Sequence, residues 1–533
     1  MSTLLCVPLL VDDVDRALAD ARLARDLGAD LVEFRVDDVF SGEGDDEGVE
    51  AVLRLSRETP CACIVTCRSS EEGGSYDGDD SARISLYEAL GVDRGAPAYV
   101  DVELSTFERS SNLRQKVRLG VVHPGQVKDL STRLILSTHD FDGRPSDLSR
   151  RLGAMVGEGA AAVVKIAFRA RSLRDNMELF ELLAARAKPT IALGMGRFGV
   201  MSRVLAPKFG AFLTFASLRD EAATAPGQPT VAELLGRYRF RSIGGGTRVY
   251  GVIGWPAEHS IGPDLHNAVF EAVGHDGVYL PMPVAPEWES FKATVLAMVD
   301  DPRLDFAGAS VTMPHKEHAL RLAEEEGWGV DDAARACGVA NTIVVGGDGV
   351  RVTNTDVVGV RDPLEDAIGG FAGKRVLVLG AGGAARAACV ACAGAEVFVA
   401  NRTRERGEAL ALDVGARLME MDAIADERFD AVVQCTPVGM AGGPDAAGSP
   451  IEGRVLDAWA TDGGGPVIFD TVYTPVRTPL LAMAEERSMR TIPGLAMFVG
   501  QARAQSELWT GMPAPTGVMR RVAEEVLASP PGG

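Results

Sequence analysis

The sequence predicts an α/β protein, with a parallel (β/α)8 barrel in its first half and a two-lobed α/β unit in its second half. Three observations lead to this prediction. Apolar segments alternate with amphipathic segments about eight times over residues 1–240, as repeated strand–helix units do. A glycine-rich segment at 241–247 interrupts the pattern. Beyond it, a glycine-rich turn at 380–383 joins an apolar strand to a helix start, which is typical of a Rossmann lobe.

Eight apolar segments of the first half are predicted to be the barrel strands. They span residues 4–9, 30–36, 62–67, 98–104, 133–137, 161–168, 190–193 and 212–215. Side chains at the carboxyl ends of barrel strands build the active site of such a fold. The polar residues at or just beyond these ends are Glu33, Arg35, Arg68, Glu103, His139, Lys165 and Arg203. Each alone could form a structural ion pair, but together we expect them to converge on one rim.

Two of these residues interrupt or end apolar segments on neighbouring strands. Lys165 lies in the middle of the segment at 160–168, and His139 ends the preceding one. Burying an ammonium group is costly, so Lys165 is either paired with a carboxylate across the sheet or kept partly neutral to attack a carbonyl. Nearby arginines would favour the free amine by like-charge repulsion and would hold an anionic substrate. With an imidazole to move protons, the pair predicts imine chemistry.

Six motifs of the first half resemble, in order, those of type I 3-dehydroquinate dehydratases. They are EFRVD at 33–37, TCR at 66–68 with EGG at 72–74, STHDF at 137–141, VKIA at 164–167, MSR at 201–203 and APGQ at 225–228. The resemblance implies that Lys165 forms a Schiff base with the substrate ketone. It further implies that His139 transfers the C2 proton and assists the loss of water, and that Glu72 orients His139. The implied substrate-binding residues are Glu33, Arg35, Arg68, Arg203, Thr224 and Gln228.

The same resemblance implies a mobile lid at 220–228, a segment rich in alanine that carries Pro226-Gly227. Thr224 in this lid replaces the serine that is usual in the family. Because the hydroxyl group is retained, we expect little effect.

The second half contains a G-x-G-x-x-A fingerprint at 380–385, after the apolar segment at 375–379. Such glycines let backbone N–H groups approach a pyrophosphate at a helix N-terminus. The next apolar segment, 396–400, is followed by Asn401, Arg402, Thr403 and Arg406. An NAD site would place an acidic residue here, whereas arginines favour the 2′-phosphate of NADP. The alternative is a solvated, basic helix start.

Lys316 and Asp356 are the candidate proton-transfer pair of the second half. Lys316 follows a proline at an expected strand-to-helix turn, and Asp356 lies just past a strand. Together they could pass a proton to or from an alcohol while a hydride moves the other way. Separately, each would more often be a surface charge or a helix cap.

Residues 248–528 resemble the shikimate dehydrogenases. The matching motifs are VIGWP at 252–256 with HS at 259–260, LHN at 265–267, VT at 311–312, KE at 316–317, NT at 341–342, NTD at 354–356, GAGGAA at 380–385, NRT at 401–403, TPVGM at 436–440, DTVY at 470–473 and GLAM at 494–497. The resemblance implies a catalytic pair of Lys316 and Asp356. It implies a substrate site formed by Ser260, Thr312, Asn341, Tyr473, Gln501 and Gln505. The implied NADP(H) site comprises Gly380, Ala381, Gly382, Gly383, Ala384, Asn401, Arg402, Thr403, Arg406, Gly494 and Met497.

Three positions depart from the shikimate dehydrogenase pattern. Gly262 replaces a serine that contacts the substrate carboxylate, while Ser310 and Gln434 replace asparagines. Losing one hydroxyl bound to a charged group would cost about 1.5–3 kcal/mol of binding, unless a larger substrate group fills the gap. Similar glycine variants occur among quinate-preferring relatives, so the choice between shikimate and quinate stays open.

We therefore expect a barrel at 1–240, a linker at 241–247 and a two-lobed dehydrogenase. Its substrate lobe would be 248–356 with the C-terminal helices of 498–533, and its Rossmann NADP-binding lobe 357–497. The net charge of −21 argues against a nucleic-acid partner, and no apolar run reaches the roughly 20 residues of a membrane span. Eight cysteines in 533 residues form no disulfide framework, which favours a reducing cytoplasm. No metal site is expected, and the chain would be a monomer or homodimer.

The leading hypothesis is a bifunctional enzyme that dehydrates 3-dehydroquinate to 3-dehydroshikimate and then reduces the product to shikimate with NADPH. One alternative makes the second unit a quinate or quinate/shikimate dehydrogenase. Another is a ligand-sensing relative without chemistry. Such a protein should have lost at least one of His139, Lys165, Lys316 and Asp356, and all four are present.

Overall fold

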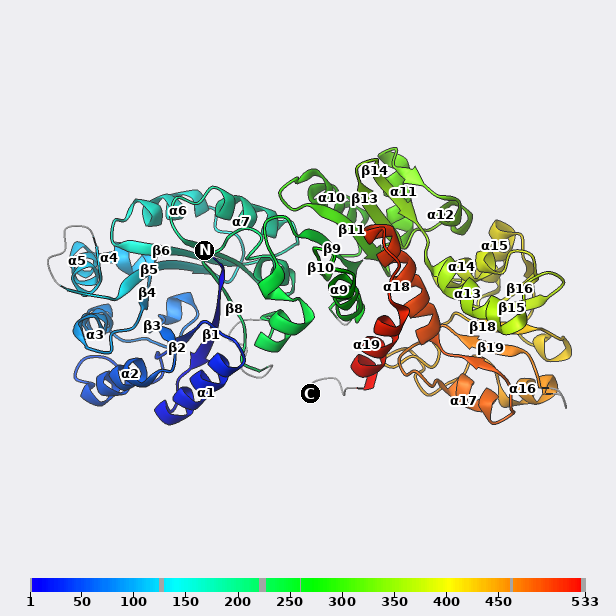
Figure 1. Ribbon diagram of the computed structural model, residues 1–533, viewed down its shortest axis with the longest axis horizontal. Helices are drawn as coiled ribbons and strands as arrows, with labels where there is room; N and C mark the ends of the chain where they lie inside the picture. Colours follow the sequence, from blue (N-terminus) through cyan, green and yellow to red (C-terminus); the bar gives the residue numbers. More distant parts are fainter. Residues whose placement is uncertain (1, 124–128, 220–226, 259, 461–463, 529–533) are drawn as a thin grey trace. The chain divides into compact units, whose positions relative to one another are not determined.

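The computed structural model describes residues 2–123, 129–219, 227–258, 260–460 and 464–528 (Figure 1). The chain divides into two compact units at Thr247. No helix in these ranges is both long and apolar enough to cross a membrane.

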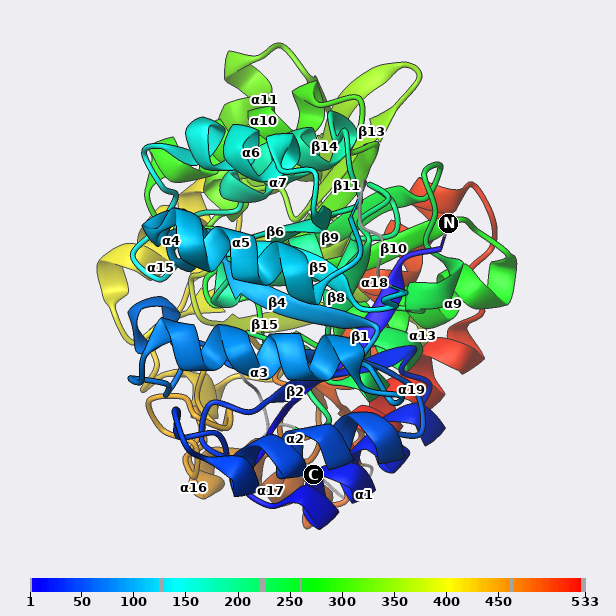
Figure 2. The ribbon, with the colours of Figure 1, turned by 90° about the vertical axis from the view of Figure 1, so that its left-hand side faces the viewer.

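The first unit is a parallel barrel of eight strands, as predicted. Neighbouring strands pair in the order β7-β6-β5-β4-β3-β2-β1-β8, and the backbone N–H of Phe212 donates to Thr190 O at 2.8 Å between β8 and β7. The strands are β1 (Leu4–Leu10), β2 (Leu31–Arg35), β3 (Ala62–Thr66), β4 (Tyr99–Glu103), β5 (Arg133–Asp140), β6 (Ala161–Arg169), β7 (Thr190–Met195) and β8 (Leu213–Phe215). The larger helices are α1 (Val14–Asp26), α2 (Asp46–Glu58), α3 (Asp80–Val92), α4 (Leu104–Arg109), α5 (Ser111–Gly120), α6 (Leu148–Gly157), α7 (Asp175–Ala184) and α8 (Val200–Val204). Helices α2, α3 and α5 lie outside the strands in Figure 2.

Strand periodicity explains how this barrel builds its mouth. The interior is filled by a cluster that includes Leu31, Tyr99, Ile135 and Val163. Successive side chains of a strand point to opposite faces, so residues two positions further along share that interior face. These residues are Glu33, Asp101, Ser137 and Lys165. The apolar core and the polar mouth therefore lie on the same inward face at different heights.

The first lobe of the second unit has a six-stranded sheet in the order β10-β9-β11-β13-β14-β12. Its strands are β9 (Arg248–Gly254), β10 (Gly277–Pro283), β11 (Phe306–Val311), β12 (Gly329–Val330), β13 (Thr342–Gly346) and β14 (Gly349–Thr353). Its helices are α9 (Gly262–Val273), α10 (Trp288–Asp300), α11 (Lys316–Glu325) and α12 (Asp332–Cys337). Strand β11 pairs parallel with β9 but antiparallel with β13, so the sheet is mixed.

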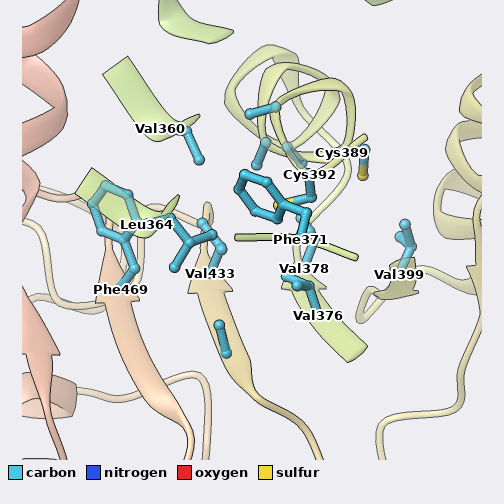
Figure 3. Close-up of a cluster of buried hydrophobic side chains, with 14 of the residues drawn as sticks. Val360, Leu364, Phe371, Val376, Val378, Cys389, Cys392, Val399, Val433 and Phe469 are labelled. Carbon is cyan, nitrogen blue, oxygen red and sulfur yellow. The ribbon is translucent and has the colours of Figure 1, made fainter. Parts of the chain in front are cut away.

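The second lobe is a Rossmann fold, as predicted. Its parallel strands run in the order β17-β16-β15-β18-β19-β20, which is the 3-2-1-4-5-6 order of dinucleotide-binding sheets. The strands are β15 (Arg375–Leu379), β16 (Glu396–Ala400), β17 (Arg417–Leu418), β18 (Ala431–Gln434), β19 (Val467–Asp470) and β20 (Thr491–Ile492). The helices are α13 (Asp356–Ile368), α14 (Gly383–Ala391), α15 (Arg404–Val414), α16 (Gly453–Trp459) and α17 (Pro479–Glu485). Figure 3 shows Val360 and Leu364 of α13 packed with Val433 and Phe469 of the sheet.

Two C-terminal helices, α18 (Gly494–Thr510) and α19 (Thr516–Ala528), complete the second unit. A buried cluster joins Leu265 and Val269 of α9 to Val499 of α18 and Met519 of α19. Helix α18 also crosses α13 closely. A Cβ built on Gly500 of α18 would lie only 3.2 Å from Gly359 Cα of α13. The last helices therefore pack against both lobes of this unit.

Candidate active sites

Lys165 is a buried amine with carboxylate partners. Its side chain is 6% exposed, its Nζ lies 3.0 Å from Asp101 Oδ2 and 3.6 Å from Glu33 Oε1, and it stands 4.7 Å from the centre of the Phe215 ring. A carboxylate across the sheet was one of the two interpretations of this lysine, and the structure gives it two such partners. Arg68, one of the arginines expected nearby, is itself paired with acids.

Arg68 is held by three groups on β4 and β5. Its Nη2 lies 2.8 Å from Asp101 Oδ1, and its Nη1 lies 3.2 Å from Glu103 Oε1 and donates to Ser137 Oγ at 2.9 Å. Burial alone would raise the pKa of Asp101, but Arg68 and then Lys165 outweigh burial and hold that pKa below its ordinary range. Asp101 is therefore an anion between the guanidinium of Arg68 and the amine of Lys165. The sequence interpretation missed it, although a charge inside the apolar segment 98–104 is the same signal that singled out Lys165.

His139 and Glu72 form a second pair at the barrel mouth. Glu72 Oε2 lies 3.1 Å from His139 Nδ1 and accepts the backbone N–H of His139 at 2.9 Å, while Glu72 Oε1 accepts from Ser105 Oγ at 2.8 Å. Since both carboxylate oxygens act as acceptors, Nδ1 carries the imidazole proton and Nε2 is left as the base. A cavity of about 400 Å³ lies beside the pair, lined in part by Ser105 and Phe141.

The pKa values of this pair shift in the directions that burial dictates. Burial, followed by the positive charges of Arg68 and Lys165, lowers the pKa of His139 well below its ordinary value. Burial also raises the pKa of Glu72, although Arg68 opposes that shift. The imidazole is therefore neutral at physiological pH and able to accept a proton.

Arg203 is a buried cation that has no ion-pair partner among the described residues. It is 3% exposed, and its Nε has no hydrogen-bond partner there. Burial lowers its pKa to about 10, so the group still carries its charge at neutral pH. A cation left in this state is suited to an anionic ligand.

The other residues predicted for the barrel site are placed as follows. Arg35 forms a bidentate ion pair with Asp37, in which Nε donates to Oδ1 at 3.0 Å and Nη2 donates to Oδ2 at 2.8 Å. Gln228 is buried. Thr224 and most of the predicted lid at 220–228 lie outside the described residues. Glu103 is shared between Arg68 and the fully buried Arg83, which gives it a structural role.

Lys316 and Asp356 meet in the second unit. Each is the first residue of its helix, and Lys316 Nζ donates to Asp356 Oδ2 at 2.5 Å. Asp356 Oδ1 accepts from Asn341 Nδ2 at 2.8 Å. The lysine side chain is 21% exposed and the aspartate 7%, so the pair is partly open on the side of the amine.

A line of hydrogen bonds continues from Asn341 into the substrate lobe. Thr342 Oγ1 donates to Asn341 Oδ1 at 2.7 Å, and Gln505 Nε2 donates to Thr342 Oγ1 at 2.9 Å. Ser310 Oγ donates to Gln505 Oε1, and Tyr279 OH donates to Ser310 Oγ, both at 2.7 Å. Ser310, noted as a departure, is thus a link in this line. Tyr279 and Thr342 were not predicted.

The remaining residues predicted for the substrate site lie around this line. Ser260 Oγ accepts the backbone N–H of Gly262 at 3.1 Å, and the Tyr473 ring packs 4.8 Å from that of Phe498. Thr312 follows β11 and is half-buried, as is Gln501 on α18. A Cβ on Gly262 would lie 3.1 Å from Ser260 Oγ and 3.4 Å from the Tyr279 hydroxyl. Even the smallest side chain at position 262 would therefore be tightly packed against these two hydroxyl groups.

The fingerprint glycines fit a dinucleotide. Gly380 has φ +114°, and a Cβ there would lie 3.2 Å from Thr436 Cγ2. Among the described residues, no atom lies within 4 Å of a Cβ built on Gly382. A Cβ on Gly383, the first residue of α14, would lie 3.5 Å from Lys316 Cδ. The N-terminus of α14 is therefore open to a pyrophosphate, with Lys316 beside it. Ala381 and Ala384 are half-buried in the same turn.

The outer part of the predicted cofactor site follows β16. Arg402, Thr403 and Arg406 are exposed, while Asn401 Nδ2 donates to Thr403 O at 2.7 Å. At the other side of the sheet, a Cβ on Gly494 would lie 2.3 Å from Val472 O. Met497 belongs to the buried core of the Rossmann lobe.

Gln434, the third departure, organises the loop after β18. Its Nε2 donates to Thr436 O and Val438 O at 3.0 and 3.1 Å, and its Oε1 accepts from the Thr436 N–H at 2.7 Å. This side chain therefore fixes the loop that closes over Gly380. All eight cysteines are free, and the described residues contain no group of three or more histidines, cysteines or acids that could hold a metal.

Four family models match the chain. The model for type I 3-dehydroquinase matches residues 5–244. In the second half, the shikimate dehydrogenase substrate binding domain matches 252–343, shikimate / quinate 5-dehydrogenase matches 364–438, and the shikimate 5'-dehydrogenase C-terminal domain matches 494–524.

Curated relatives share the same two parts. The bifunctional 3-dehydroquinate dehydratase/shikimate dehydrogenase of Arabidopsis thaliana, named chloroplastic, is 36% identical over 96% of this chain and 83% of its own length. A shikimate dehydrogenase (NADP(+)) of Geobacter sp. strain M21 is 40% identical over 54% of this chain and 99% of its own. The pentafunctional AROM polypeptide of Schizosaccharomyces pombe is 30% identical over 93% of this chain and 32% of its own. Both predicted resemblances are confirmed, and the chain belongs to the bifunctional 3-dehydroquinate dehydratase/shikimate dehydrogenase family.

Proposed function

We propose that this bifunctional enzyme dehydrates 3-dehydroquinate through an imine on Lys165, and reduces 3-dehydroshikimate with NADPH by proton transfer from the Lys316–Asp356 pair. The observation that carries the first part is the buried Lys165 amine, set among carboxylates near a neutral His139. The observation that carries the second is the Lys316–Asp356 pair packed against Gly383 of the dinucleotide fingerprint.

In the barrel, Lys165 Nζ adds to the ketone carbon, and the carbonyl oxygen leaves as water to give an iminium. His139 Nε2 then removes the C2 proton, while the iminium accepts the electron pair of the broken C–H bond. The hydroxyl on the adjacent carbon leaves as water with the proton that His139 returns. Hydrolysis of the imine releases the product and the free amine. Arg203 would hold the substrate carboxylate, because it is a buried cation with no ion-pair partner among the described residues.

In the second unit, Lys316 donates a proton to the ketone oxygen as that oxygen becomes an alcohol. Asp356 holds the ammonium in position, and Asn341 fixes Asp356 through its other oxygen. The open N-terminus of α14 and the exposed Arg402 and Arg406 would bind a phosphorylated dinucleotide, which supplies the hydride when bound. The name of the Geobacter relative, which specifies NADP(+), supports the same cofactor.

A coupled assay tests both parts. The purified chain is mixed with 3-dehydroquinate and NADPH, and the nicotinamide absorbance is followed. We expect oxidation of NADPH that depends on 3-dehydroquinate. Borohydride added with 3-dehydroquinate should attach the substrate skeleton to Lys165, as peptide mass mapping would show. A folded chain with neither turnover nor label at Lys165 would contradict the barrel mechanism.

Two single variants separate the activities. Lys165→Ala should abolish turnover of 3-dehydroquinate but leave the reduction of added 3-dehydroshikimate unchanged. Lys316→Ala should abolish the reduction of 3-dehydroshikimate but leave the dehydration of 3-dehydroquinate unchanged, so 3-dehydroshikimate should accumulate. Full reductase activity in Lys316→Ala would remove the assignment of the proton donor.

A second candidate function for the second unit is quinate dehydrogenation. Gly262 favours it, because a glycine lacks the hydroxyl that a serine at this position would offer to the substrate carboxylate. Oxidation of shikimate and quinate with NADP+ and NAD+ should be compared in the natural chain and in Gly262→Ser. We expect the serine to raise the kcat/KM ratio of shikimate over quinate by about tenfold or more. An unchanged ratio would exclude position 262 as the determinant.

We also propose a compartment, a set of ligands and an oligomeric state for the enzyme. Eight free cysteines favour a reducing compartment, which we take to be the cytoplasm. The ligands would be 3-dehydroquinate, 3-dehydroshikimate, shikimate and NADP(H), without metal or nucleic acid. The chain would act as a monomer or homodimer.

A further inference from the structure

Asp101 contacts Lys165, Arg68 and Ser137 inside the barrel. It is 1% exposed, on the inward face of β4, and no assigned role accounts for it. Its two oxygens are occupied differently. Oδ1 accepts from Ser137 Oγ at 2.6 Å and faces Arg68 Nη2 at 2.8 Å, whereas Oδ2 faces Lys165 Nζ at 3.0 Å.

We propose that Asp101 is a positioning residue of the dehydratase, which acts as the counter-ion of the iminium on Lys165 and keeps that nitrogen protonated while His139 moves the C2 proton. This inference rests on the proposed imine mechanism. It concerns the nitrogen of the intermediate, whereas the residues considered so far bind the substrate or move its C2 proton.

The balance of protons explains why a counter-ion is needed. The free amine carries two hydrogens on Nζ. One of them, together with an added proton, leaves with the carbonyl oxygen as water. One N–H remains on the positively charged iminium. If this last proton is lost, the neutral imine accepts the electrons of the C2–H bond less readily. A carboxylate within hydrogen-bonding distance, away from water, favours the charged form.

Asp101 is better placed for this role than the second carboxylate. Glu33 Oε1 lies 3.6 Å from Nζ and accepts from Thr66 Oγ1 at 2.6 Å. Asp101 Oδ2 is closer, and the two contacts of Oδ1 fix the direction in which Oδ2 points. Because Arg68 and Ser137 stabilise the carboxylate, Asp101 accepts a hydrogen bond from the iminium without removing its proton.

A purely structural role is the competing explanation. Asp101 would then serve only to neutralise Arg68 in the barrel interior. Loss of such a pair would change stability and KM, but it would leave the pH at which the intermediate loses its proton unchanged. The pH profile of kcat therefore separates the two explanations.

The experiment uses the full-length chain with Asp101→Asn, which keeps the size of the side chain and removes its charge. Dehydratase kcat is measured from pH 6 to pH 10. We expect a large loss of kcat and an alkaline limb displaced by about 1–3 pH units toward lower pH, the size expected for losing an adjacent opposite charge. Borohydride trapping at Lys165 should decline over the same shifted range. Reductase activity in the same chain serves as the internal control and should be unchanged.

Glu33→Gln is the matched control, since it removes the other carboxylate near Nζ. Its kcat and KM are expected to change, and its alkaline limb should move toward lower pH by less than that of Asp101→Asn, because Glu33 Oε1 lies farther from Nζ than Asp101 Oδ2 does. An unmoved limb in Asp101→Asn, or an equal displacement in Glu33→Gln, would overturn the inference.

A second variant keeps the test decisive if the asparagine disrupts the barrel. Asp101→Glu retains the charge, so its limb should stay near that of the natural chain even where kcat falls. A limb displaced by a unit or more in this variant would also overturn the inference. Failure of the natural chain to label Lys165 would instead remove the imine mechanism itself, so the two failures are distinguishable.

Discussion

At the scale of single residues, burial keeps His139 neutral and able to accept a proton. The imidazole is enclosed with Arg68 and Lys165 nearby, and these factors lower its pKa well below its ordinary value. Its Nδ1 is tied to Glu72, which leaves Nε2 as the base. The same burial has a cost in stability. Because the unfolded chain binds an additional proton at His139 below about pH 6.5, the barrel is destabilised as the pH falls below that value.

The first prediction concerns the acid side of the dehydratase pH profile. Since the neutral form of His139 persists into acidic solution, kcat should not fall with a midpoint near pH 6.5, where a free imidazole would titrate. Dehydratase kcat should be measured between pH 5 and pH 8 at saturating 3-dehydroquinate. The assignment would be contradicted if the kcat profile of the natural chain shows a limb centred near pH 6.5 and this limb is absent in Glu72→Gln, because the limb would then belong to the His139–Glu72 pair.

At the scale of elements, α9 and α18 meet around a buried histidine. His266 of α9 contacts Ser506 Oγ of α18 at 2.9 Å, and its ring lies 4.4 Å from that of Tyr279 and 5.1 Å from that of Trp509. Burial lowers the pKa of His266 to about 3. Between that value and the ordinary value near 6.5, the unfolded state binds one more proton than the folded state.

The second prediction follows from this difference. Acidification from pH 6.5 to pH 5 should remove about 2 kcal/mol from the free energy of unfolding of the second unit through His266 alone. His266→Gln should lack this part of the pH dependence. Urea denaturation followed by tryptophan fluorescence is a suitable measurement, because all five tryptophans lie beyond residue 248. An identical pH dependence in the variant would contradict the prediction.

The third prediction concerns the crossing of α13 and α18. A Cβ on Gly359 would lie 2.7 Å from Met497 O, so Gly359→Ala should force the helices apart and destabilise the second unit by about 1–3 kcal/mol. Asp356 begins the same helix, so reductase kcat should fall as well. Gly517→Ala on α19 is the matched control, since no atom of the described part of the chain lies within 4 Å of a Cβ there, and the change should be neutral or slightly stabilising.

At the scale of the whole molecule, each unit contains its own set of site residues. The proposed dehydratase residues all precede Thr247, and the proposed reductase residues all follow it. Neither set borrows a residue from the other unit. The two reactions should therefore be separable between chains, provided that 3-dehydroshikimate is released into solution.

The fourth prediction tests this separability. A one-to-one mixture of Lys165→Ala and Lys316→Ala chains should convert 3-dehydroquinate to shikimate with NADPH, after a lag in which 3-dehydroshikimate accumulates. The time course of NADPH absorbance measures the lag. A mixture that stays inactive, although each variant keeps its remaining activity, would show that the intermediate passes only within one chain.

The sequence predicted the eight barrel strands because each is an apolar run between amphipathic helices. It predicted β5 too short, since His139 and Asp140 continue to pair with Ala167 and Phe168 although they are polar. Lys165 was found because a cation in an apolar strand is conspicuous. Asp101 carries the same signal in the segment 98–104, but its role depends on which cations face it across neighbouring strands, and the sequence does not show them. The role of Gln434 likewise depends on the path of a loop, which no local pattern specifies.

The line of hydrogen bonds from Tyr279 to Asp356 has a polarity, because each link donates toward the aspartate. Asp356 can only accept, so it dictates the orientation of the amide and hydroxyl groups upstream, including those on a strand that contributes nothing to the chemistry. A mutation that reverses one donor along this line would have to be matched by reversals at its neighbours. Evolution at these positions should consequently proceed by paired exchanges, while isolated replacements are rejected.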